Sequence, residues 1–230
     1  MRRLFSIVLV VVVLLLVGAA GAVLSWRWLD PVTTSFIVQR KVGEVLAGGS
    51  ARDVEHVWVD AHAISPHMGI AVIASEDQRF REHWGFDLES IQSAIEDRQS
   101  GGRMRGASTI TQQVAKNLLL WPGRSWLRKG LEAYLTVLIE AFWPKERILE
   151  VYLNVAQFGD KTFGVAAASR RFFDKHPSEL GPREAALLAA VLPNPVRLRA
   201  DDPSPYVLRR VRWIRRQMER LGGSAYAHGI

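Results

Sequence analysis

The sequence predicts an all-α protein carried on one N-terminal membrane helix. Three observations lead to this class: an apolar run opens the chain, later windows place apolar residues at helical spacing, and no useful stretch alternates apolar and polar residues as a strand would. With 230 residues, of which 48% are hydrophobic and 23% charged, the chain can bury one full core. We therefore expect one domain plus an anchor.

The N-terminal run has the length of a membrane span. Arginines at positions 2 and 3 precede a nearly unbroken apolar stretch at residues 4–24, and about 20 residues cross a bilayer. A cleavable signal peptide is the alternative, because residues 20–22 match an Ala-x-Ala cleavage site. Trp26 and Trp28 favour a retained anchor with an interfacial aromatic belt. The arginines then place the N-terminus in the cytoplasm and everything after Trp28 outside.

The chain is basic, with a formal net charge of +7, and it contains no cysteine. The lack of cysteine excludes disulfides and thiolate metal sites. A basic soluble domain would suggest nucleic acid, but an exported domain held at a bilayer meets anionic lipid head groups and phosphorylated lipids instead. A solvated basic face is the alternative explanation. We expect no nucleic-acid partner.

An acidic pair ends the first helix of the main domain. Broken helical pieces are expected over residues 29–64, and Ser65 with Pro66 then begins an apolar helix that delivers Glu76 and Asp77. Acidic residues at a helix C-terminus oppose the macrodipole, which disfavours a purely structural acidic turn. Burial beside apolar side chains raises a carboxyl pKa, and this suits Glu76 to general-base work near neutral pH.

A basic, glycine-rich loop and a polar helix follow. Residues 99–107 break all periodicity, and we interpret them as either a plain connection or a lid over a site. Ser108 and Thr109 are suited to cap the next helix. Amides and a single lysine project from one side of that helix and favour a ligand-facing surface, at positions Gln112, Gln113, Lys116 and Asn117.

The next long helix carries a second candidate acid. Arg128 and Glu132 stand four residues apart in the order that stabilises a helix less, which weakens the interpretation as an ordinary surface ion pair. Glu140 lies two turns beyond Glu132 and is the alternative second acid. A further helix is expected to begin at Lys145, after a proline.

The C-terminal third is expected to be core and surface. Two alanine-rich helices, at residues 164–173 and 182–192, are predicted to pack inside the domain. The last helix places six arginines around an apolar stripe, so docking on the domain with the arginines in solvent is favoured over attraction to a membrane surface.

At this point four blocks of residues match a known family pattern in order. They are Glu76-Asp77-x-x-Phe80-x-x-His83-x-Gly85, Gly106-x-Ser108-Thr109-Ile110-Thr111-Gln112-Gln113-x-x-Lys116-Asn117, Arg128-Lys129-x-x-Glu132, and Lys145-x-x-Ile148-Leu149-Glu150-x-Tyr152-Leu153-Asn154. The chain resembles the monofunctional peptidoglycan glycosyltransferases, the biosynthetic transglycosylases of glycosyltransferase family 51. The resemblance implies a lysozyme-like helical domain with a small membrane-adjacent subdomain.

The resemblance divides the chain into a cytoplasmic tip and anchor at 1–28, a membrane-adjacent segment at 29–64, a glycosyltransferase domain at 65–221 and a tail at 222–230. It implies inverting transfer of a lipid-pyrophosphate-linked disaccharide-peptide, lipid II, to the 4-hydroxyl of an acceptor sugar, which elongates β-1,4 glycan chains. The implied location is a bacterial inner membrane, with the catalytic domain on the periplasmic face. Other cell-wall synthesis and division proteins are possible partners.

Site roles also follow from the resemblance. Glu76 is the implied general base and Glu132 the second catalytic carboxylate. Lys116, Arg128, Lys129 and Lys145 are the cations available to stabilise a departing pyrophosphate. The wider substrate-binding set is Ser108, Thr109, Gln112, Gln113, Lys116, Asn117, Arg124, Arg128, Lys129, Lys145 and Asn154. The implied structural positions are Asp77, Phe80, His83, Gly85, Glu150 and Tyr152. No cofactor is certain, and a magnesium ion is possible.

Two rival functions remain open on the sequence. A glycan-cleaving muramidase would share the fold, but it protonates a sugar oxygen and has no need of a basic array around a pyrophosphate. A catalytically silent membrane scaffold is the other alternative, and the intact motif acids count against it. No Ser-x-x-Lys tetrapeptide occurs in the chain, so we expect no transpeptidase activity.

Overall fold

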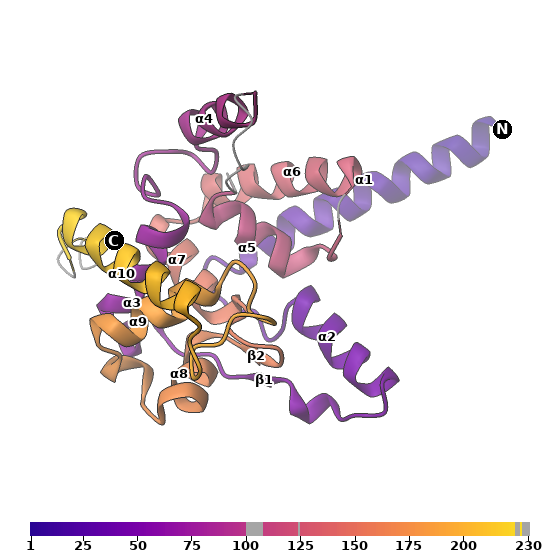
Figure 1. The fold of residues 1–230 in the computed structure, drawn as a ribbon. Coiled ribbons are helices and arrows are strands. Elements are labelled where there is room, and N and C mark those ends of the chain that lie inside the picture. The colour runs from indigo at the N-terminus through magenta and orange to yellow at the C-terminus, as the bar shows by residue number, and fades with distance from the viewer. Residues whose placement is uncertain (100–107, 124, 224–225, 227–230) are drawn as a thin grey trace.

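A computed structural model describes residues 1–99, 108–123, 125–223 and 226 (Figure 1). The predicted all-α class is confirmed. The helices are α1 (Arg2–Ser25), α2 (Ser35–Leu46), α3 (Pro66–Glu76), α4 (Leu88–Gln99), α5 (Ile110–Leu119), α6 (Trp126–Phe142), α7 (Lys145–Val155), α8 (Val165–Phe173), α9 (Pro182–Val191) and α10 (Pro205–Arg220). Short 3-10 turns lie at Ala51–Asp53, Ala61–Ala63 and Pro177–Glu179.

One small sheet accompanies the helices. β1 (Glu55–His56) pairs in parallel with β2 (Thr162–Phe163). Sequence alternation gave no sign of this pair, because two residues are too few to show a period. The sheet ties the membrane-adjacent segment to the C-terminal half of the domain.

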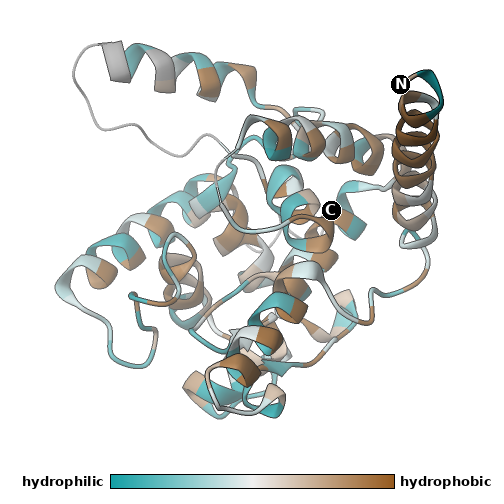
Figure 2. Ribbon diagram, turned by 90° about the vertical axis from the view of Figure 1, so that its right-hand side faces the viewer, coloured by the Kyte–Doolittle hydropathy of each residue, from teal (hydrophilic) through white to brown (hydrophobic). Residues whose placement is uncertain are grey.

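α1 is the apolar helix that the sequence predicted. In the described part of the chain it is the one helix long and apolar enough to cross a membrane. It projects from the domain and is hydrophobic along most of its length, with a hydrophilic N-terminal tip (Figures 1 and 2). The C-terminal half of α1 packs on α6 and on Trp143, the residue after α6. Tyr134 Oη donates to the Leu16 carbonyl at 3.0 Å, and Trp143 Nε1 donates to the Val23 carbonyl at 2.7 Å.

The membrane-adjacent segment packs on the main domain through α2. Thr34 caps α2, and Ile37 lies in a small buried cluster with Val54 and Phe163. The Ser35 hydroxyl contacts the Leu120 carbonyl at the end of α5. The segment is therefore joined to the helix that lines the site.

The core is built around α3, whose inner residues Met68 to Ala74 are all buried. The Ser65 side chain caps α3 and Pro66 occupies its first turn, as the sequence predicted. α3 packs on α9 and α10, while α5 packs on α6 and α7. The C-terminal end of α3 reaches the boundary between these two groups of helices, and Glu76 lies at that end.

Candidate active site

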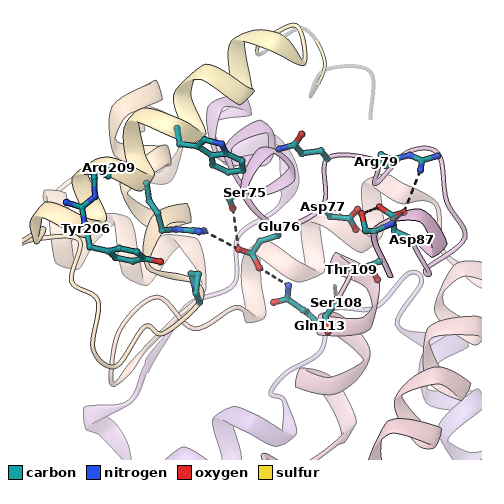
Figure 3. Close-up of a pocket in the computed structure, with 15 residues that line it drawn as sticks. Ser75, Glu76, Asp77, Arg79, Asp87, Ser108, Thr109, Gln113, Tyr206 and Arg209 are labelled. Carbon is teal, nitrogen blue, oxygen red and sulfur yellow. Dashed lines mark hydrogen bonds and ion pairs between the residues drawn. The ribbon is translucent and has the colours of Figure 1, made fainter. Parts of the chain in front are cut away.

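A cleft of about 1070 Å³ opens at the end of α3. Its walls come from the α3 C-terminus, the loop into α4, the start of α5 and one face of α10. Figure 3 shows Glu76 near its centre, with Tyr206 and Arg209 of α10 to one side and Thr109, Ser108 and Gln113 to the other. The site thus lies where the two helix groups of the core meet.

Glu76 is a buried carboxylate with few hydrogen-bond donors. Its side chain is 15% exposed. Gln113 Nε2 donates to Oε2 at 3.0 Å, and Arg210 Nη2 lies 3.9 Å from Oε1. Burial raises the pKa of Glu76 and outweighs the opposing effects of Gln113 and Arg210. The direction predicted from the sequence is confirmed, and a carboxyl of this kind is suited to accept a proton near neutral pH.

Asp77 holds the beginning of α5 beside Glu76. Its Oδ1 accepts from His83 Nε2 at 2.8 Å, and its Oδ2 accepts from the Ile110 backbone N–H at 2.9 Å. The Gly85 N–H donates to His83 Nδ1, which leaves Nε2 as the ring nitrogen that faces Asp77. This pair supports the positioning role that the resemblance implied for Asp77 and His83.

Gly85 lets the α3–α4 loop approach α6 closely. Its φ is +76°, and an added Cβ would stand 2.5 Å from Thr136 Cγ2. The Gly85 carbonyl accepts from Thr109 Oγ1 at 2.7 Å, which joins the loop to the start of α5. Phe80, from the same motif, is fully buried. Both residues belong to the loop between α3 and α4 and hold it against the domain.

α5 contributes one amide to the cleft. Gln113 faces Glu76, and Tyr152 Oη donates to Gln113 Oε1 at 3.2 Å, which turns the amide nitrogen toward the carboxylate. Burial raises the pKa of Tyr152 well above its ordinary value and keeps the phenol protonated as a donor. Gln112 instead closes the capping box with Thr109 and is 4% exposed. The structure thus shows Gln112 holding the start of α5, and its expected contact with a ligand stays a prediction.

Basic side chains gather around Glu132. Arg128 Nη1 donates to Oε2 at 2.7 Å, and Lys129 pairs with Oε1. Burial lowers the pKa of Lys116, and the nearby Glu132 carboxylate opposes this only in part, so the pKa lies below its ordinary value. The Lys116 ammonium also stands 5.6 Å from the centre of the Phe36 ring. Glu132 itself is 3% exposed and orders these cations.

Lys145 belongs to a different arrangement. Its ammonium donates to the His83 carbonyl at 2.7 Å and to Glu140 at 2.9 Å, and it lies 4.7 Å from the centre of the Phe80 ring. Thr111 donates a further hydrogen bond to Glu140 at 2.6 Å. The structure therefore separates the two candidate acids: Glu132 organises the cations, whereas Glu140 fastens Lys145 under the α3–α4 loop.

Comparison with known proteins gives the family of the chain. A family model described as Transglycosylase matches residues 42–219. The chain belongs to the transglycosylase family. A biosynthetic peptidoglycan transglycosylase of Pseudomonas entomophila is 53% identical over 209 residues, 91% of this chain and 88% of that protein. One from Klebsiella oxytoca is 56% identical over 194 residues, 84% and 80% of the two chains. One from Citrobacter koseri is 51% identical over 227 residues, 98% and 93%. The family predicted from the four motif blocks is confirmed.

Two expected substrate residues of this transglycosylase-family chain have other surroundings. Asn154 is 0% exposed; its amide nitrogen donates to the Val59 carbonyl at 2.8 Å, and its oxygen accepts from the Val59 N–H at 2.9 Å. The structure gives Asn154 a role in fastening the 29–64 segment, because no polar atom of the amide faces the cleft. Asn117 is 9% exposed, and its backbone carbonyl accepts from the hydroxyl of Ser35, the first residue of α2. Glu150, expected to be structural, accepts from the Ala61 N–H and pairs with Arg147.

Two predictions concern residues outside the described part of the chain. Arg124 and most of the loop at 99–107 fall there, so the expected substrate contact and the lid stay predictions.

The described residues offer no prepared metal site. Over 1–99, 108–123 and 125–223, no three His, Asp or Glu side chains gather closely enough to hold an ion. Glu132 and Glu140 are engaged with lysine or arginine, and Asp77 with His83.

Sequence reasoning missed the wall formed by α10. Tyr206, Arg209, Arg210 and Trp213 line the cleft, although the arginines of this helix were expected to face solvent. Residues 206, 210 and 213 share one helix face at four- and three-residue spacing, and this was the available signal. The stronger apolar stripe beside it, with Val207 and Ile214 buried, concealed it.

Proposed function

We propose that this chain polymerises peptidoglycan glycan strands from a lipid-pyrophosphate-linked disaccharide-peptide. Membership of the transglycosylase family and the printed names of its relatives support the reaction class. The observation that carries the proposal is the buried Glu76 carboxyl, whose pKa is raised and whose orientation is fixed by Gln113 at the centre of an open cleft. A group so placed can take a proton from a sugar hydroxyl.

The proposed step is a single inverting displacement. The 4-oxygen of the acceptor sugar attacks the anomeric carbon of the donor, and its proton passes to Glu76. As the new C–O bond forms, the bond to the lipid pyrophosphate breaks and its electron pair leaves with the phosphate oxygen. Lys116, Arg128 and Lys129 offset the negative charge that develops there. Glu132 holds two of these cations in place before the substrate arrives.

Inversion accounts for the product. One displacement without a covalent intermediate converts an α-linked lipid donor into a β-linked polymer. A hydrolase would instead need an acid to protonate a sugar leaving oxygen, and pyrophosphate leaves without obligatory protonation. The cluster of cations around a buried acid therefore favours synthesis over cleavage.

The proposed location is the outer face of a bacterial inner membrane. α1 supports a single-pass anchor, and the arginines at positions 2 and 3 favour a cytoplasmic N-terminus. Trp126 and Leu127 at the start of α6 are 93% and 71% exposed, and such apolar exposure suits a domain that rests on lipid. A lipid-linked substrate would then enter from the bilayer.

The test is incubation of the detergent-solubilised protein with lipid-linked precursor, followed by muramidase digestion of the product. We expect a polymer that the muramidase degrades to disaccharide units. Glu76→Gln should abolish it, whereas the matched control Glu82→Gln, with a side chain 60% exposed, should retain it. Release of reducing ends from finished peptidoglycan without polymer formation would support the cleaving enzyme instead. Unchanged turnover in Glu76→Gln would remove Glu76 from the base role.

A further inference from the structure

Most of the excess positive charge of the chain lies on one helix. α10 carries six arginines and one glutamate, so it contributes +5 to a formal net charge of +7. Two of these arginines line the cleft beside Glu76. The other four are exposed and lie outside the cleft: Arg212, Arg215, Arg216 and Arg220. We call these four residues the arginine ridge, and the reaction proposed above uses none of them.

The arginine ridge is a band of like charges on one side of α10. On a helix, residues three and four apart are neighbours, so Arg216 lies next to both Arg212 and Arg220, and Arg212 lies next to Arg215. Like charges at this spacing destabilise the helix that carries them. The ridge is therefore a feature that folding by itself does not favour.

No acidic side chain among the described residues neutralises the arginine ridge. The one ion pair of α10 within that part of the chain joins Arg210 to Glu76, in the cleft. Glu219 is the one acid of the helix, and although it is exposed beside the ridge it forms no ion pair there. Four guanidinium groups thus face solvent without a partner in the described chain, and such a surface is suited to an anionic ligand.

A lipid surface does not fit this helix. A helix that binds at a membrane surface inserts its apolar face between the lipids. The apolar face of α10 is buried in the core instead, with Val207, Ile214 and Met218 among its buried residues. α10 also lies on the side of the domain opposite the N-terminal tip of α1 (Figure 1). Attraction to anionic head groups fades within about 10 Å of a bilayer, so a ridge on this side gains little from it when α1 spans the membrane.

The spacing of the arginine ridge fits carboxylates on a helix. A guanidinium binds a carboxylate through forked, charge-assisted hydrogen bonds. Arg212, Arg216 and Arg220 follow one another at four-residue intervals, which is about 6 Å along the axis. Glutamates or aspartates repeated every three or four residues on another helix have the same spacing. The exposed large apolar side chains of α10, Tyr206 and Trp213, both line the cleft, so the ridge offers a partner charge alone.

We propose that the arginine ridge docks an acidic helix of a partner protein on the outer side of the membrane. The carboxylates of that helix pair with the ridge arginines. Because the contact has no apolar anchor, the complex is transient and weakens as salt screens the charges. Docking leaves the cleft open, since the ridge residues do not line it. The inference uses α1 as an anchor but not the polymerisation reaction, so it goes beyond the proposed function.

Binding of a defined acidic peptide tests the ridge. The probe is a fluorescent, helix-forming peptide of about 20 residues with glutamates at every third and fourth position, long enough to be helical in water. It is titrated at low salt into the full-length protein in detergent and followed by anisotropy. Arg212→Gln, Arg216→Gln and Arg220→Gln combined should weaken binding at least about tenfold, because three exposed pairs are lost. Glu219→Gln should strengthen it about twofold, because it removes the one acid beside the ridge.

The matched control removes the same charge elsewhere. Arg52→Gln, Arg170→Gln and Arg183→Gln combined alter three exposed arginines outside α10 and should bind the peptide as the parent does. Equal losses in both triple variants would reduce the effect to net charge and overturn the ridge. A peptide of the same composition with scrambled glutamate positions should bind at least about threefold more weakly, and equal binding would overturn the match to a helix.

Thermal unfolding separates docking from a structural role. The triple variant of the ridge should melt at the parental temperature or above it, because like-charge repulsion is relieved. A lower melting temperature together with unchanged peptide binding would show that the arginines serve the fold, and would overturn the proposal.

A single label distinguishes a protein helix from a lipid surface. The chain contains no cysteine, so Arg216→Cys accepts one environment-sensitive dye. The labelled protein is reconstituted in phosphatidylcholine vesicles with or without phosphatidylglycerol. The dye emission should be the same in both and change on addition of the peptide, whereas Leu127→Cys, at the exposed start of α6, reports contact with lipid. A blue shift at position 216 with anionic lipid alone would assign the ridge to the bilayer and overturn the proposal.

Polymerisation assays keep this inference apart from the proposed function. The triple variant of the ridge should make polymer at the parental rate when no partner is present. A protein that binds the peptide through the ridge yet makes no polymer would refute the proposed function and leave the ridge standing. Normal polymerisation with no dependence of peptide binding on the ridge would do the reverse.

Discussion

Lys145→Ala is predicted to lower the free energy of unfolding rather than to act directly on the chemical step. The ammonium makes hydrogen bonds to the His83 carbonyl and to Glu140, and its side chain is 22% exposed, while that of Glu140 is 5% exposed. Removing one partner of a buried pair costs about 3–5 kcal/mol, because the other charge stays buried without compensation. Partial access of water to Lys145 offsets some of this, so we expect a loss of about 2–4 kcal/mol.

The expected loss translates into a measurable change in melting temperature. For a chain of this size, each kcal/mol lowers the melting temperature by about 2–4 °C, which gives a fall of roughly 5–15 °C. The assay is thermal unfolding in detergent followed by circular dichroism, with turnover measured well below the transition. Adding Glu140→Gln should recover part of the loss, because the double variant no longer buries an unpaired charge.

Lys129→Ala is the contrasting variant. Its side chain is 44% exposed and Arg128 still pairs with Glu132, so the loss of stability should stay within about 1 kcal/mol. Turnover should nevertheless fall strongly, because Lys129 belongs to the cations around Glu132. A Lys145→Ala protein with parental melting temperature and no turnover would refute this reasoning and place Lys145 on the pyrophosphate, as the sequence suggested.

Three further changes have defined outcomes. Gly85→Ala should cost about 2–5 kcal/mol through positive-φ strain and a clash with Thr136, and Thr136→Ser should relieve part of it in a double-mutant cycle of unfolding free energies. Gln113→Leu removes a donor that stabilises the charged Glu76 carboxylate, so the Glu76 pKa rises and the acidic limb of the pH–rate profile moves to higher pH; a limb at parental pH would contradict this. Intact mass of protein purified from membranes should include residues 1–25, whereas a new N-terminus near residue 23 would identify a cleaved signal.

The local pattern of the sequence determined the helices that deliver the base. Ser65 and Pro66 begin α3 as expected, and α3 ends at Glu76 with Asp77 following it. The apolar α1 was also evident, as was the cap at Thr109. Each of these features depends on residues within a few positions of one another, so the chain's own periodicity and capping preferences specify them. The raised pKa of Glu76 followed from the same local apolar surroundings.

Only the tertiary structure decided what each polar side chain contacts. Gln112 and Gln113 are neighbours in sequence, yet one caps α5 and the other faces Glu76. Lys145 and Asn154 were predicted to bind substrate, and in the structure they contact His83 and Val59, whose positions no local pattern predicts. The same holds for the side chains of α10 that line the cleft, because their position beside Glu76 also depends on packing between distant segments. The Gln112 cap is local, but the contacts of Gln113, Lys145 and Asn154 join residues tens of positions apart. Packing of the folded core brings such residues together, whereas propensity acts only along a few neighbouring residues.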